Sequence, residues 1–421
     1  MEIIGGGVVA PLGFKTAGVY CGIKRKRKDL ALIVSDVDAA AAGVFTTNIV
    51  KAPCVYGNQN VIERGTARAI VCNSGNANAC NGDQGYEDAA EMMRQAAEAL
   101  HLSPSQILSA STGVIGHRLP IEKVTAGIQA AAQILHGDEC ADTAEAIMTT
   151  DTTQKQLAVE FDVDGVKVRM GAIGKGSGMI APNMATMLAF ITTDAAIEQP
   201  VLQEMLRRVC WYTFNSITVD GDTSTNDMTL VLANGVAGNK MIDNLESTGA
   251  REFEKALYSI CLYLAKEIAR DGEGATKLVE VIVQNVAVPE KLAATYAANE
   301  ITMTPEQRAG FARSIAKTVA NSPLVKTALF GNDPNWGRIL AAVGRGGVEF
   351  DPEKVEIALA GTTVYRQGMP TNFNGYVVSE AMKAKDLQIV IDLHQPNGES
   401  AAVWTCDFSY DYVKINAEYH T

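Results

Sequence analysis

The residues best suited to chemistry lie in the stretch GKGSGMIAPNMATMLAF, where a threonine directly follows an alanine. Cleavage of the Ala185–Thr186 peptide bond would free the α-amine of Thr186, a group with an ordinary pKa of about 7.7–8.0. That amine could take the proton of the Thr186 hydroxyl, which would make this threonine a self-sufficient nucleophile. Backbone strain at the bond would be permitted by the upstream glycines Gly174, Gly176 and Gly178. A structural hydroxyl at the start of a buried strand fits the same pattern.

The same stretch also begins like a nucleotide-binding loop, but the details exclude both common types. A P-loop requires Ser or Thr after Gly-Lys, whereas Gly176 follows Lys175. The segment GSGMIA matches the loose dinucleotide pattern, yet Pro182 stands where a helix should begin. We therefore expect no phosphate site here.

A third motif, DGDTSTND (220–227), starts like a calcium-binding loop. Asp220 and Asp222 have the required spacing, but Thr225 occupies the glycine position and Val231 the glutamate position. The five histidines and eight cysteines form no HxxxH or CxxC pair. We expect a polar loop at 220–227 and no metal site in the chain.

The elements around Thr186 mix strands and helices. Strands are predicted at 30–34, 43–45, 69–72, 187–193 and 228–233, and helices at 86–101, 121–135, 200–213 and 253–269, with another helix beginning at Thr304-Pro305. Alternation around Asp164-Gly165 predicts a β-hairpin with a type I′ turn. The small-residue segments 73–82 and 109–116 are predicted to be a loop and a turn. This order favours layered sheets with helices outside.

Composition limits the partners and the compartment. The net charge of −12 disfavours nucleic acid and anionic membranes as partners. The short basic run at 24–28 is interpreted as a solvated turn, and no apolar stretch is long enough to span a bilayer. We expect no signal peptide. Most cysteines have apolar neighbours, which is typical of buried thiols in a reducing cytosol, so we expect a cytoplasmic protein.

Seven segments spread over the chain together resemble one family, the ornithine acetyltransferases, also called glutamate N-acetyltransferases. They are NSGNANACNG (73–82), STGVIG (111–116), MTTDT (148–152), KGSGMIAPNMATML (175–188), RDGEGATK (270–277), GNDPNWGRI (331–339) and NAEYHT (416–421). The resemblance implies an α/β fold, a layered αββα sandwich that resembles the N-terminal nucleophile hydrolases but has distinct connectivity. It also implies self-cleavage between Ala185 and Thr186 into an α chain (1–185) and a β chain (186–421).

The resemblance further implies ping-pong acyl transfer in the cyclic pathway of arginine biosynthesis. Thr186 would accept the acetyl group of N2-acetylornithine, and glutamate would then collect it. Thr112 and Gly113 would form the oxyanion hole; without the family, Ser-Thr-Gly would be taken for a plain turn. The residues implied to contact substrate are Thr149, Lys175, Thr186, Glu273, Asn416 and Thr421, although Thr150 and Thr152 compete with Thr149. Contacts at Asn416 and Thr421 would require a docked C-terminal tail.

Several alternatives stay open at the level of sequence. A self-processing aminopeptidase or amidase of the related fold, with water as the acceptor, is the second hypothesis, and a binding protein that merely retains the fold is the third. No resident cofactor is expected. Whether acetyl-CoA serves as a co-substrate is undecided by any motif, and we favour the bifunctional alternative. The family suggests a heterotetramer of two α and two β chains acting on small molecules.

Overall fold

The computed structural model describes residues 1–181 and 187–418, which form two compact units. Among the described residues, unit 1 contains 1–181, 187–215 and 222–268, and unit 2 contains 216–221 and 269–418. The predicted division into chains 1–185 and 186–421 is a matter of processing, and its junction lies outside the described residues. None of the helices in the described part of the chain combines the length and apolar character needed to cross a membrane.

Unit 1 is built on one sheet with the strand order β1-β6-β7-β8-β9-β3-β4-β5, and β2 pairs with β3 beside this path. The strands are β1 (Glu2–Ile4), β2 (Phe14–Val19), β3 (Leu30–Phe45), β4 (Thr66–Asn76), β5 (Ile107–Val114), β6 (Lys155–Val163), β7 (Val166–Lys175), β8 (Leu188–Thr193) and β9 (Met228–Ala233). Its helices are α1 (Pro53–Glu63), α2 (Gly82–Leu100), α3 (Ile121–Gln133), α4 (Ala141–Ile147), α5 (Gln199–Tyr212) and α6 (Thr248–Arg270).

The sheet of unit 1 folds over itself because β3 takes part in both halves. Its first part pairs with β2 and β4, its last part pairs with β9, and the register shifts between Val34 and Ala39. The prediction of separate strands at 30–34 and 43–45 was therefore wrong. The consecutive exposed residues 36–38 lie at this bend, and the strand continues through it without a break.

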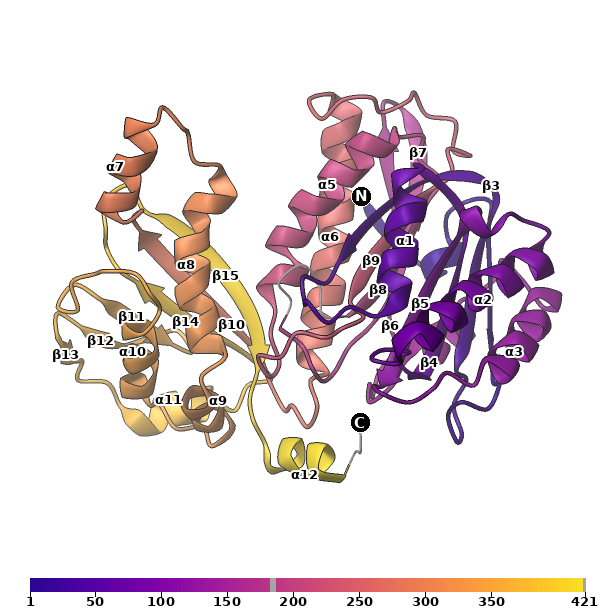
Figure 1. Cartoon of the computed structure of the whole chain (residues 1–421). Coiled ribbons are helices and arrows are strands. Elements are labelled where there is room, and N and C mark those ends of the chain that lie inside the picture. The colour runs from indigo at the N-terminus through magenta and orange to yellow at the C-terminus, as the bar shows by residue number, and fades with distance from the viewer. Residues whose placement is uncertain (182–186, 419–421) are drawn as a thin grey trace. The chain divides into compact units, whose positions relative to one another are not determined.

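Alternation along β3 explains the layers. Leu30, Leu32 and Val34 share one apolar core with helices α2 and α3. Ala31 and Ile33 point the other way, into a core that also holds residues of β7, β8 and β9. Against the outer face of the second half, Phe253 of α6 packs edge-on to Phe161 of β6. The result is the predicted αββα sandwich, with strands between α2/α3 and α5/α6 (Figure 1).

The predicted hairpin joins β6 to β7. Asp164 and Gly165 both have positive φ, 50° and 88°, as a type I′ turn requires. Predicted helices at 86–101, 121–135, 200–213 and 253–269 correspond to α2, α3, α5 and α6, with ends shifted by up to five residues.

The eight cysteines are free thiols, and all but Cys21 and Cys80 are buried. Burial raises the pKa of the Cys54 thiol to about 12.

The loop predicted at 73–82 and the turn predicted at 109–116 were wrong in their first parts, which are strands, while 77–81 and 115–116 are irregular as predicted. Ser109–Val114 belongs to β5, and Asn73–Asn76 continues β4, so the two run as parallel neighbours from Ala69 and Ile107 onward. Small side chains are typical of turns, but here they permit the backbones of β4 and β5 to approach closely.

Unit 2 is a second α/β layer with the strand order β13-β12-β11-β14-β10-β15. Its strands are β10 (Leu278–Val286), β11 (Glu356–Leu359), β12 (Thr362–Arg366), β13 (Met369–Pro370), β14 (Asp386–Asp392) and β15 (Glu399–Cys406). Its helices are α7 (Glu290–Ala298), α8 (Pro305–Ala320), α9 (Pro323–Phe330), α10 (Trp336–Gly344), α11 (Gly375–Ala381) and α12 (Tyr410–Glu418). Val279, Val281 and Val283 of β10 pack in one core with Ile315 and Val319 of α8. Thr304 caps α8 as predicted, through a capping box with Gln307.

The packing around two glycines can be tested by replacing each with alanine. At Gly171 of β7, a Cβ atom would overlap the carbonyl oxygen of Gly7, so Gly171→Ala should lower the free energy of unfolding by about 1–3 kcal/mol. At Gly310 of α8, no atom lies within 4 Å of an added Cβ, so Gly310→Ala should raise it by about 0.5–1 kcal/mol. Chemical denaturation of both variants measures this, and equal effects would contradict the packing described.

Candidate active site

Thr112 and Gly113 lie at the end of β5, where the parallel ladder to β4 becomes irregular. Gly113 has a φ of 132°, and a Cβ there would overlap the carbonyl carbon of Gly75. The Asn226 side chain donates to the carbonyl oxygen of Ser111 at 2.8 Å, which orients the peptide that leads into Thr112. A fixed hydroxyl and fixed backbone amides therefore stand at one end of the strand.

Lys175 ends β7 and brings three predicted residues together. Its ammonium Nζ donates to Thr149 Oγ1 at 2.8 Å and to Thr112 Oγ1 at 3.4 Å. The Lys175 residue is only 7 % exposed, whereas both threonines are partly exposed. Thr149, one of the three candidate threonines in MTTDT, therefore contacts Lys175 directly. An ammonium can only donate, so both hydroxyl protons are left to face other groups.

Asp151 is a member of this cluster that the sequence analysis missed. Its side chain is fully buried, and Oδ1 accepts from Lys155 Nζ at 2.8 Å and from the Gly176 amide at 2.7 Å. Oδ2 accepts from the Thr149 amide at 3.0 Å and lies 3.8 Å from Lys175 Nζ. Burial alone would raise the pKa of Asp151, but the two ammonium groups and these hydrogen bonds hold it well below its usual range.

Lys155 was also missed, although the hairpin carried a signal for it. Along β6, residues 159, 161 and 163 are buried, and Lys155 has the same parity. A lysine on the apolar face of an alternating strand has to find a buried counter-charge, because an unpaired buried ion is very costly. Lys155 is 1 % exposed and finds Asp151 four residues earlier.

The basic run at 24–28 does more than the predicted solvated turn. Lys24 Nζ donates to the carbonyl oxygen of Met148 at 2.9 Å, and Arg27 donates to that of Asp151 at 3.0 Å. Lys28 pairs with Asp142. The carboxylate of Asp29 ties the turn together by accepting backbone amides, including that of Lys24 at 2.9 Å. The turn thus holds the segment that contains Thr149 and Asp151.

Asp227, in the calcium-like segment, is a buried acid in the same unit. One of its carboxyl oxygens, Oδ2, has no hydrogen-bond partner among the described residues. Burial raises the pKa of Asp227 well above its ordinary value, and the nearby Lys175 opposes this only in part. Burial therefore favours the protonated form of the Asp227 carboxyl group.

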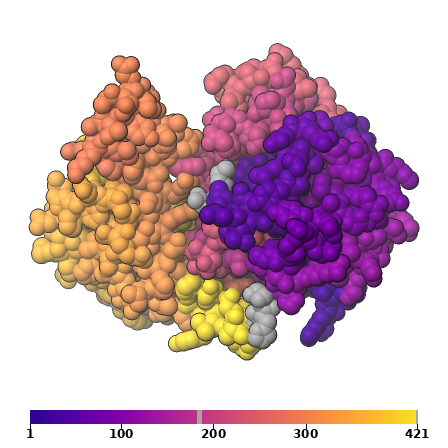
Figure 2. Space-filling model, in the orientation of Figure 1, coloured from indigo at the N-terminus to yellow at the C-terminus, as the bar shows by residue number. Residues whose placement is uncertain are grey.

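Unit 2 joins two other predicted residues. Glu273 lies in the loop after α6 and is 8 % exposed, and Asn416 Nδ2 of α12 donates to its Oε2 at 2.8 Å. Ser409 Oγ also donates to the carbonyl oxygen of Gly274. Helix α12 is thus docked on the Glu273 loop, as the predicted role of the tail requires. Figure 2 shows α12 at the surface, in keeping with the exposed Tyr410 and Val413.

Three predicted residues, Ala185, Thr186 and Thr421, lie outside the described part of the chain. The chain is described again from Met187, whose carbonyl oxygen accepts from the Met228 amide at 2.9 Å. Met187 leads directly into β8, which confirms the strand predicted after Thr186.

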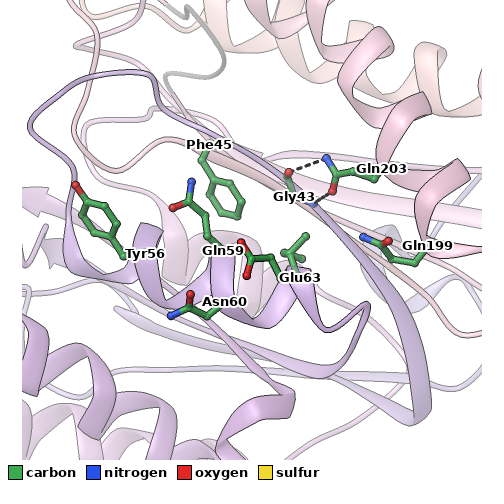
Figure 3. Close-up of a pocket in the computed structure, with 9 residues that line it drawn as sticks. Gly43, Phe45, Tyr56, Gln59, Asn60, Glu63, Gln199 and Gln203 are labelled. Carbon is green, nitrogen blue, oxygen red and sulfur yellow. Dashed lines mark hydrogen bonds between the residues drawn. The ribbon is translucent and has the colours of Figure 1, made fainter.

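A separate pocket of about 680 Å³ lies between α1, β3 and α5 (Figure 3). Its lining is mainly polar: Gly43, Phe45, Tyr56, Gln59, Asn60, Ile62, Glu63, Gln199 and Gln203. Gln203 accepts from the Gly43 amide and donates to its carbonyl oxygen, both at 3.0 Å, which closes the free edge of β3. None of the predicted site residues lines this pocket, so we assign it no part in the chemistry.

The raised pKa of Asp227 predicts a pH effect on stability. An aspartate ionises near pH 4 in the unfolded chain, so folding takes up a proton above that pH. The stability contribution is complete below the unfolded pKa and declines as the pH rises toward the raised folded pKa. Asp227→Asn, which is neutral in both states, should therefore show a smaller loss of unfolding free energy between pH 5 and pH 8 than the wild type. Parallel stability curves would show that Asp227 is ionised in the folded chain.

Comparison with known proteins identifies the family of the chain. The ArgJ family model matches residues 15–421. The chain is 50% identical over 424 residues to the arginine biosynthesis bifunctional protein ArgJ of Symbiobacterium thermophilum, covering 100% of both, and 45% identical to the same-named protein of Synechocystis, covering 100% of the chain and 99% of the relative. It is also 41% identical to a solved ornithine acetyltransferase from Mycobacterium tuberculosis complexed with ornithine, over 43% of this chain and 96% of that one, with a TM-score of 0.40. From the extent of the family match and these identities, the chain belongs to the ArgJ family.

Proposed function

We propose that the chain is an acetyltransferase of arginine biosynthesis that moves the acetyl group of N2-acetylornithine to glutamate through an acetyl ester on Thr186. The observation that carries the proposal is the Lys175 ammonium against the Thr112 and Thr149 hydroxyls, beside Gly113. The names of the curated relatives support the pathway, and the ornithine complex of the solved relative supports the substrate class.

The first step of the proposal is self-cleavage. The Thr186 hydroxyl attacks the carbonyl carbon of Ala185, the peptide C–N bond breaks, and an ester joins the two residues. Water hydrolyses the ester, which leaves a carboxylate on Ala185 and a free amine and hydroxyl on Thr186. This produces the proposed α chain (1–185) and β chain (186–421).

The second step is acyl transfer. Thr186 Oγ attacks the acetyl carbonyl of N2-acetylornithine while its α-amine takes the hydroxyl proton, and that proton then leaves with the ornithine amine. The amine of glutamate attacks the acetyl ester and restores the hydroxyl. Each tetrahedral intermediate carries an oxyanion, for which the Thr112 hydroxyl and the Gly113 amide are the proposed donors. Such a donor is worth about 3–4 kcal/mol of barrier.

The remaining assignments concern the ends of the substrate. Lys175 and Thr149 supply positive charge and a hydroxyl suited to a carboxylate, and Glu273 supplies a carboxylate suited to an ammonium group. Asn416, which holds Glu273, and Thr421 complete the proposed contacts.

Further parts of the proposal extend beyond the site. The word bifunctional in the relatives' names supports acetyl-CoA as a second acetyl donor, so that N-acetylglutamate would also be made directly. We propose no resident cofactor, a heterotetramer of two α and two β chains, and a cytoplasmic location, which suits eight free thiols.

Self-cleavage is tested on a denaturing gel. The active wild-type protein should give two fragments, 1–185 and 186–421, and Thr186→Ala should stay a single chain without transferase activity. Thr302→Ala, which removes an exposed hydroxyl in unit 2, is the control and should be cleaved like the wild type. An active protein that runs as one intact band would rule out the mechanism.

The acceptor is tested by supplying N2-acetylornithine with and without glutamate. A transferase should release ornithine in steady state only when glutamate is present, and initial rates should follow a ping-pong pattern. An amidase would release ornithine equally fast without glutamate, and a binding protein would form no acetyl adduct on the fragment that begins at Thr186. N-acetylglutamate formed from acetyl-CoA and glutamate alone would establish the second donor.

A further inference from the structure

The buried ion pair of Asp151 and Lys155 has a use beyond packing. Each residue is 1 % exposed, Lys155 Nζ lies 2.8 Å from Asp151 Oδ1, and Lys175 Nζ lies 3.8 Å from Asp151 Oδ2. Replacing a buried ion pair by apolar residues is often neutral or stabilising, so stability alone does not explain the pair. The geometry of the carboxylate indicates what the pair does.

Each oxygen of Asp151 joins a backbone segment to a lysine. Oδ1 accepts from the Gly176 amide and from Lys155, and Oδ2 accepts from the Thr149 amide and lies 3.8 Å from Lys175 Nζ. The carboxylate therefore fixes the end of β7 and the Thr149 segment around the same ammonium. Lys155 is the nearer of the two lysines, at 2.8 Å.

Lys155 thereby sets the position of Lys175. With Lys155 in place, the negative charge of Asp151 is shared. Lys175 Nζ then lies 3.8 Å from Asp151 Oδ2, beyond hydrogen-bond distance, while it donates to Thr149 and Thr112. Without Lys155, Lys175 would be the sole counter-ion of a buried carboxylate and would be drawn toward it, away from Thr112.

We propose that Asp151 and Lys155 are positioning residues for acyl transfer, which hold the Lys175 ammonium against Thr112 so that the Thr112 hydroxyl must donate outward, toward the oxyanion. The inference rests on the proposed function. To that function the inference adds a role for Lys175, which acts through Thr112. Its ammonium donates to the Thr112 hydroxyl oxygen, so the hydroxyl proton has to point elsewhere. Neither positioning residue touches the substrate.

The test measures kcat, KM and thermal stability per cleaved chain, starting with the wild type. Lys155→Met keeps a balanced Asp151–Lys175 pair and should fold. Its kcat should fall by about 10²-fold, the loss expected when one oxyanion donor is misplaced, with KM changed much less. Asp151→Asn should act in the same direction.

The matched control is Asp194→Asn, which changes a buried carboxylate of the same unit that accepts the backbone amides of Leu12 and Arg169. It should lower the melting temperature and leave kcat within about twofold, because distant sites act independently. A double-mutant cycle with Thr112→Val completes the test. In the Thr112→Val background, Lys155→Met should have almost no further effect on kcat, since the hydroxyl it positions is gone.

The possible outcomes distinguish failure of the proposed function from failure of the positioning role. A wild type that forms no acetyl adduct on the 186–421 fragment would refute the proposed function. If the wild type forms the adduct but Lys155→Met keeps its kcat, or if its effect adds fully to that of Thr112→Val, only the positioning role is refuted. If Asp151→Asn fails to fold, the Lys155→Met cycle decides alone.

Discussion

The buried carboxylate of Asp151 is the constraint on which the site of unit 1 depends. Two lysines and two backbone amides converge on its oxygens, and they come from β6, from the end of β7 and from the segment after α4. A buried charge is tolerated only when it is paired and hydrogen-bonded, so these segments can hardly move independently. The position of Lys175 follows from this arrangement, and the orientation of the Thr112 and Thr149 hydroxyls follows from Lys175.

Small residues at the ends of β4 and β5 are the second constraint on the site of unit 1. The ends of β4 and β5 approach so closely that a side chain on Gly113 would overlap the backbone of Gly75. The same closeness leaves Thr112 at the margin of the sheet, partly exposed, with its preceding carbonyl held by Asn226. The apolar layers on both sides of the sheet keep this strand end in place, since Leu108 and Ala110 of β5 belong to the core shared by the two halves. Packing thus turns an ordinary-looking Ser-Thr-Gly segment into a rigid donor site.

Much of the fold could be predicted because its signals are local. Alternation around Asp164-Gly165 gave the hairpin, and apolar periodicity gave helices α2, α3, α5 and α6 to within a few residues. The segments 73–76 and 109–114 could not be assigned in this way, because Gly, Ser, Ala and Asn have weak strand preference and their pairing partners are distant in sequence. The bend that makes β3 a single strand in both halves of the sheet has the same origin. It is decided by its neighbours β4 and β9.

The sequence by itself determined the types of reactive groups, the family they resemble and the layered arrangement of helices and strands. Thr112, Gly113, Thr149 and Lys175 could be named from motifs, because each motif is contiguous along the chain. Only the tertiary structure decided that Lys175 donates to both threonines, that the buried Asp151–Lys155 pair lies next to it, and that the basic turn at 24–28 supports the same segment. Those contacts depend on burial, which strengthens charge interactions and makes an unpartnered polar group costly, and burial is a property of the whole fold.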